Sequence, residues 1–91
     1  MKIFYRFHAS PQFHSTVFDS DHVSVFDLKK RIMLERKLGK GTDFHLHVYN
    51  EDGNEPSELN DRYRLRDTQM IRVRRTPAKA PGNGSAQQYV N

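Results

Sequence analysis

Residues 24–50, SVFDLKKRIMLERKLGKGTDFHLHVYN, decide the fold because they predict one amphipathic helix, its stop signal and the strand that follows. Ser24 and Asp27 have the spacing of a capping box, which satisfies early backbone N–H groups and places a carboxylate at the positive end of the helix dipole. Apolar residues then recur on one helical face: Val25, Leu28 and Ile32. This stripe is typical of a helix that packs against a sheet.

Charge and glycine mark the end of this helix. Lys37 suits the negative C-terminal end of the dipole, Gly39 suits a left-handed cap, and Gly41 keeps the chain from continuing as helix. We therefore expect the helix over about 25–38. The next residues alternate apolar and polar and predict a half-buried strand, with its inward side chains from Phe44, Leu46 and Val48 and its outward ones from His45, His47 and Tyr49.

Three further segments have the pattern of strands. Residues 2–8 and 13–18 flank the turn Ser10-Pro11-Gln12 and predict an N-terminal hairpin, and residues 69–75 predict a last strand that ends before Pro77. The expected core positions outside the helix and its following strand are Ile3, Tyr5 and Phe7 on the first strand, and Phe18, Tyr63, Leu65, Ile71 and Val73. A helix that carries the chain across the sheet makes the first and last strands candidates for parallel neighbours.

Composition limits the chain to one small domain. It has 91 residues, 35% of them hydrophobic, and no cysteine, so neither disulfides nor thiolate-bound zinc can stabilise it. No apolar run is long enough for a membrane span, and no secretory signal pattern follows Met1, so we expect an intracellular monomer. The net charge is +4, and basic residues dominate from residue 62 onward.

Two segments are expected to lie outside the packed body. Residues 51–61 carry five acids and no base and predict a solvated acidic loop. Residues 77–91 are rich in Pro, Gly, Ser and Ala and predict a flexible linker after a domain over 1–76. Tyr89-Val90 is the exception in this linker, either as a docking element or as an incidental flexible end.

Several separated blocks resemble the DWNN domain, a ubiquitin-like module at the N-terminus of retinoblastoma-binding-protein and Mpe-type subunits of the mRNA cleavage and polyadenylation machinery. The blocks are Ile3-Phe4-Tyr5-Arg6-Phe7, Phe18-Asp19, Val25 to Lys30, Lys37-Leu38-Gly39, Gly41-Thr42-Asp43-Phe44, Tyr49-Asn50 and Val73 to Ala78. The resemblance implies an α+β fold, the ubiquitin-like β-grasp, with a mixed four- to five-stranded sheet and one main helix on one face. The chain departs from the family pattern at Glu55-Pro56-Ser57-Glu58 and at Tyr63-Arg64-Leu65-Arg66.

The same resemblance implies a function. Family members continue into a zinc knuckle and a RING finger, and neither lies in this cysteine-free chain. The resemblance implies a nuclear, non-catalytic module that docks on the endonuclease subunit of the polyadenylation complex, and the contact residues that we expect are Asp43, Arg75 and Pro77, supported by Arg74 and Tyr49. Asp43 has the alternative role of capping the turn before its strand. Other hypotheses are a recruiting domain of a RING-type ubiquitin ligase, an RNA-binding module and a conjugated modifier, which the absence of a terminal glycine pair disfavours.

No cofactor or metal is predicted. His45 and His47, with His8 on a neighbouring strand, have a spacing that can hold a metal, but solvent-facing histidines are the simpler interpretation. Gly39-Lys40-Gly41-Thr42 follows a helix, whereas a phosphate-binding loop precedes one. The outward sheet face is predicted to be basic and aromatic and to suit an acidic protein or weakly bound RNA, through Phe4, Arg6, His8, His45, His47, Tyr49, Arg72 and Arg74.

Overall fold

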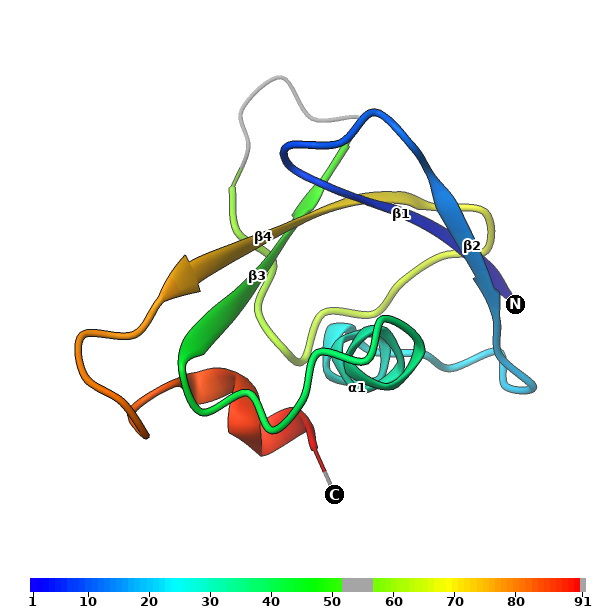
Figure 1. Ribbon diagram of the computed structural model, residues 1–91. Helices are drawn as coiled ribbons and strands as arrows, with labels where there is room; N and C mark the ends of the chain where they lie inside the picture. Colours follow the sequence, from blue (N-terminus) through cyan, green and yellow to red (C-terminus); the bar gives the residue numbers. More distant parts are fainter. Residues whose placement is uncertain (52–56, 91) are drawn as a thin grey trace.

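The computed structural model describes residues 1–51 and 57–90. Its elements are β1 (Lys2–Phe7), β2 (His14–Val17), α1 (Val25–Glu35), β3 (Phe44–Asn50), β4 (Met70–Pro77) and the 3₁₀ helix η1 (Ser85–Tyr89). The strand order in the sheet is β2-β1-β4-β3, with β1 and β4 parallel and the two outer pairs antiparallel. α1 lies across one face of this sheet (Figure 1). The predicted mixed sheet, its single main helix and its parallel central pair are confirmed.

The core lies between α1 and the sheet. The predicted stripe of Val25, Leu28 and Ile32 is fully buried, in one cluster with side chains from β1, β3 and β4. Burial of each such side chain contributes about 1.5–3 kcal/mol, so this interface accounts for much of the stability of a small domain. Phe18 and Leu65 are buried as predicted, whereas Phe44 and Tyr63 are only partly buried.

The start of α1 is as predicted, and its end is not. The Ser24 hydroxyl accepts from the Asp27 backbone N–H, and the Asp27 carboxylate accepts from the Ser24 N–H, which completes the capping box. The helix ends at Glu35 instead of residue 38, because Lys37 has a φ of 54° and leaves helical geometry. The Leu38 N–H then donates to the Met33 carbonyl at 3.1 Å, the closing bond of a Schellman motif. Lysine thus occupies the left-handed position that the sequence suggested for glycine.

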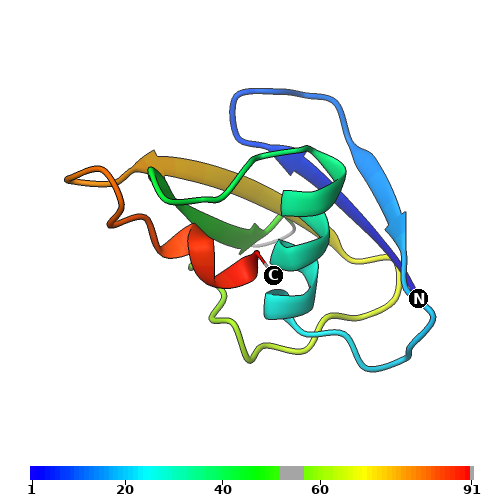
Figure 2. The same ribbon diagram turned by 60° about the horizontal axis from the view of Figure 1, so that its bottom comes forward.

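The segment after β4 is the main correction to the sequence-based prediction. Residues 78–90, here called the tail, fold back on the domain instead of forming a flexible linker, and η1 lies beside α1 and below β3 (Figure 2). Ala86 and Tyr89 are buried, and the Gly84 N–H donates to the Thr42 carbonyl at 2.7 Å. A Cβ at Gly84 would lie 2.5 Å from the Phe44 backbone nitrogen, so the tail approaches β3 as closely as only glycine allows.

A buried polar cluster joins the tail to α1. The Lys29 ammonium, whose side chain is 4% exposed, donates to Asp61 at 2.8 Å and to the Tyr89 hydroxyl at 3.0 Å. The Tyr89 hydroxyl donates in turn to Asp61 at 2.8 Å. Burial and the hydrogen bond to Asp61 raise the pKa of Tyr89 above its usual value, so this hydroxyl keeps its proton and remains a donor. The cluster pairs a desolvated ammonium with two oxygen acceptors, as a buried charge requires.

We found no helix, within the part of the chain that the structure describes, that is long and apolar enough to cross a membrane. Residues 52–56 of the predicted acidic loop, which include Glu55 and Pro56 where the chain departs from the family pattern, lie outside the described residues.

Gly84→Ala tests the packing of the tail. The added methyl meets three backbone atoms within 2.6 Å, so we expect the free energy of unfolding in urea to fall by about 1–3 kcal/mol. Asn83→Ala is the control, because Asn83 is exposed and its change should stay within about 0.5 kcal/mol of the wild type. Equal stability of the two variants would contradict a tail that packs on the domain.

Lys37→Gly tests the left-handed residue that ends α1. An L-residue in this conformation costs about 1–2 kcal/mol and glycine in the unfolded chain offsets part of the gain, so we expect a net stabilisation of about 0.5–1 kcal/mol in urea unfolding. Lys37→Ala removes the charge but keeps Cβ, and it should give no such gain. Stabilisation by alanine equal to that by glycine would show that the charge, and not the backbone, is responsible.

Candidate protein-interaction surface

The pairing of β3 with β4 places the five predicted contact residues on two different faces. Arg75 pairs with Leu46 and Pro77 with Phe44, so these residues belong to the side of the sheet that α1 covers. Arg74 pairs with His47, and Tyr49 pairs with Arg72, on the opposite face. The structure therefore places Arg75 and Pro77 on the helix side of the sheet, with Asp43 at the same end of the sheet directly before β3, and places Arg74 and Tyr49 on the other face.

The sheet-end surface, defined here as Asp43, Phe44, Arg75 and Pro77, lies where β3 begins and β4 ends. Asp43, Arg75 and Pro77 are exposed, and the Arg75 guanidinium lies over the Phe44 ring at 5.2 Å from its centroid. The Ala78 N–H donates to the Asp43 carbonyl at 2.9 Å, which extends the β3–β4 pairing past Pro77. Within the described residues the Asp43 carboxylate makes no hydrogen bond or ion pair, so the alternative capping role is not seen. A cation and an apolar ring are in contact here, and an anion lies at the start of β3 at the same end of the sheet.

A hollow of about 290 Å³ adjoins this surface at the ends of β1 and β4. Its lining residues are Phe7, His8, Ala9, Val73, Arg74 and Arg75. Sequence analysis assigned Phe7 to the core, but this ring is only half-buried. Phe7 is the last residue of β1, and this position at the end of a strand was the signal in the sequence that its ring packs on fewer neighbours than Ile3 and Tyr5 do.

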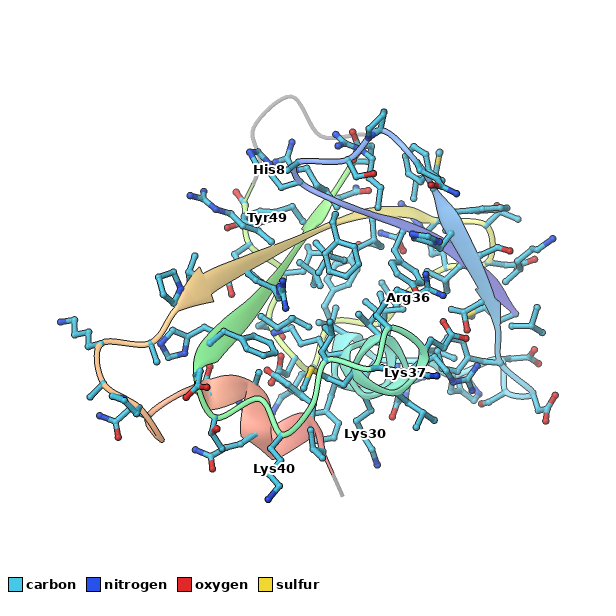
Figure 3. The ribbon with its side chains drawn as sticks, viewed as in Figure 1. His8, Lys30, Arg36, Lys37, Lys40 and Tyr49 are labelled. Atoms are coloured by element: carbon cyan, nitrogen blue, oxygen red, sulfur yellow. The ribbon has the colours of Figure 1, made fainter. Side chains whose placement is uncertain are left out.

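The outward face of the sheet is less basic than predicted, because its own side chains neutralise or cover several of its cations. Arg6 binds Glu51 through two contacts, at 2.8 Å and 3.1 Å. The Arg72 guanidinium lies 5.3 Å from the centroid of the Tyr49 ring. The imidazole Nδ1 of His47 is 3.0 Å from a carboxylate oxygen of Glu58. Arg74 and His8 remain exposed on this face (His8 and Tyr49 are labelled in Figure 3).

The two strand histidines are engaged in local contacts. The Nδ1 atom of His45 accepts from the Ser85 backbone N–H at 3.1 Å and lies 2.7 Å from the Ser85 hydroxyl, so His45 caps the start of η1. His47 contacts the Thr76 hydroxyl through Nε2 at 2.9 Å, in addition to Glu58. No group of three metal-ligating side chains occurs within residues 1–51 and 57–90. These histidines serve the fold in the described structure, His45 by holding the tail.

Comparison with known proteins gives consistent matches. The family model of the DWNN domain matches residues 3–77. An uncharacterized RING finger protein of Schizosaccharomyces pombe is 39% identical over 90 residues, which cover 98% of this chain and 18% of that protein. Protein MPE1 of Saccharomyces cerevisiae is 41% identical over 76 residues, 84% of this chain and 17% of that protein. The chain thus spans less than a fifth of the length of either relative.

The match over nearly all of β1 to β4 agrees with the capped helix, the strand order and the parallel central pair described above. It confirms the resemblance drawn from the sequence and, with it, the ubiquitin-like fold. The chain therefore belongs to the DWNN domain family and is a ubiquitin-like interaction module.

Proposed function

We propose that this domain is the docking module of a nuclear pre-mRNA 3′-end cleavage and polyadenylation factor subunit and that it binds the endonuclease subunit through the sheet-end surface. The resemblance to Mpe-type subunits supports the choice of complex and of partner, and Protein MPE1 is among the relatives. The observation that carries the choice of surface is the contact of the Arg75 guanidinium with the Phe44 ring, next to Pro77 and at the end of the sheet where Asp43 lies.

This assembly has the chemistry of a specific protein contact. An arginine forms directional, paired hydrogen bonds with a carboxylate, and arginine and aromatic residues are enriched among the residues that dominate interface energies. Asp43 supplies the opposite charge at the same end of the sheet, so a partner must present both signs in the correct register. The antiparallel pairing of β3 with β4 fixes the backbone of Phe44, Arg75 and Pro77 before the partner binds. This pre-organisation lowers the entropy cost of association.

The hollow beside the surface adds an apolar element to the same site. Phe7 and Val73 provide its apolar lining, and Arg74 and Arg75 border it. A side chain of the partner that enters this hollow contacts the Phe7 ring and places any carboxylate near two guanidinium groups. Arg74 thereby contributes to the site as a lining residue of the hollow. Tyr49, in contrast, lies on the other face, where Arg72 covers its ring.

Direct RNA binding is the weaker alternative. Arg6 is paired with Glu51, and Arg72 covers the ring of Tyr49, which would otherwise be free to stack on a base. Contacts to phosphate weaken steeply as salt rises, so the salt dependence of binding separates this alternative from protein docking.

A role in a RING-type ubiquitin ligase is a second candidate, favoured by the RING finger relative from Schizosaccharomyces pombe. In that case the domain recruits a substrate or a component of the ubiquitin pathway to a ligase whose zinc-binding residues lie elsewhere, because this chain contains no cysteine.

The double variant Asp43→Lys with Arg75→Glu tests the endonuclease proposal. It reverses both charges of the sheet-end surface, and we expect co-purification of the endonuclease from nuclear extract to be lost. Both residues are exposed, and the loss of the Arg75–Phe44 contact costs about 0.5–1 kcal/mol, so the melting temperature should fall by only a few degrees.

Asp21→Lys with Arg62→Glu is the matched control, because it makes the same charge reversal at two exposed residues outside the sheet-end surface. This control should bind as the wild type does. Retention of the endonuclease by the first variant would refute the proposed surface, and equal loss in both variants would point to nonspecific electrostatic attraction.

A further inference from the structure

A second surface lies between α1 and the tail. A groove of about 520 Å³ is lined by Lys30, Met33, Leu34, Lys37, Gly39, Tyr89 and Val90. It shares no residue with the sheet-end surface or with the hollow beside it. We call it the α1–η1 groove. One wall is α1 and the other is the end of the tail, so the groove exists only because the tail folds back on the domain.

The α1–η1 groove exposes apolar groups that no described residue of the chain covers. Leu34 is 76% exposed and Val90 is 37% exposed, whereas Met33 and Tyr89 beneath them are each 4% exposed. Among the described residues, the large apolar side chains left exposed are Val17, Leu34 and Val90, so two of the three lie in this groove. Such a concentration of uncovered apolar surface in a concave site is typical of a docking groove.

Lysines surround this apolar floor. Lys30 and Lys37 line it, and Lys40 follows Gly39 at its edge; Figure 3 shows Lys30 and Lys40 projecting on the side of the molecule where α1 and η1 lie. No carboxylate pairs with any of these three lysines within the part of the chain that the structure describes. Lys37 also has a φ of 54°, a backbone conformation in which glycine is more stable than lysine. Local strain of this kind is often found at functional sites.

We propose that the α1–η1 groove docks an acidic amphipathic helix of a partner protein. Its apolar stripe covers Leu34 and Val90, and its carboxylates pair with Lys30 and Lys37. Lys30 lies on α1 and Lys37 lies two residues past its end at Glu35, so acidic residues about two turns apart on the docked helix reach both. The apolar floor gives RNA no phosphate partner, and the net charge of +4 disfavours a second copy of this chain.

A titration with a designed peptide tests this proposal. The probe is a synthetic helix of about 16 residues with a leucine and phenylalanine stripe flanked by glutamates, added to the isotope-labelled chain. We expect amide signals to shift at Lys30, Met33, Leu34, Lys37 and Val90. Leu34→Ser should weaken binding by about tenfold or more, since it removes the largest exposed apolar contact.

Exchange of the charges between the groove and the peptide gives a more specific test. Lys30→Glu with Lys37→Glu should abolish binding of the glutamate peptide and create binding of the same peptide with lysines in place of its glutamates. Val17→Ser is the control for Leu34→Ser, because Val17 is 60% exposed on β2 and outside the groove. Endonuclease binding should be unchanged in Leu34→Ser, which separates this site from the proposed function.

Three results would overturn the proposal: shifts confined to residues outside the groove, equal binding of the glutamate and lysine peptides, or unchanged binding by Leu34→Ser. Binding of a single-stranded oligonucleotide that competes with the peptide would assign the same lysines to RNA instead, and would count against it too.

Discussion

The packing of one short helix on the sheet is the constraint on which the rest of this structure depends. Val25, Leu28 and Ile32 are fully buried by it, and their burial contributes an amount comparable with the whole stability of a small domain. No disulfide shares this task, because the chain has no cysteine. The helix and the tail leave a hollow at the ends of β1 and β4, lined by Phe7, Val73 and Arg75 among others, and the sheet-end surface adjoins it.

Local features of the sequence allowed most of the fold to be predicted. The capping box, the apolar stripe and the alternation in β3 depend on residues close in the chain, and all three occur as expected. The docking of the tail could not be predicted in this way, because Tyr89 contacts Lys29 across 60 residues and its neighbours have the composition of a linker. The left-handed Lys37 was missed for a different reason, since propensity favoured the nearby Gly39.

The positions of the predicted contact residues follow in part from the sequence. Arg75 and Pro77 lie on one face because the alternation of β3 and β4 sets their register, and Asp43 lies at the same end of the sheet because it directly precedes β3. Arg74 and Tyr49 fall on the opposite face, because a strand presents successive residues to opposite sides. The half-buried ring of Phe7 was not predicted, since its pattern is that of a core residue.

The tail joins the two surfaces of the domain. Gly84 bonds Thr42, the residue before Asp43, and Ser85 is held by His45 on β3, while Tyr89 and Val90 form a wall of the α1–η1 groove. Displacement of the tail would therefore alter the groove directly and remove contacts that support the start of β3.

Hydrogen–deuterium exchange of the domain, measured alone and with the purified endonuclease subunit, tests the central claim most directly. Docking through the sheet-end surface should slow exchange in peptides that cover residues 42–46 and 73–78, and leave peptides from residues 30–38 unchanged. Protection confined to residues 30–38, or to the outward strand positions around Tyr49, would contradict the account.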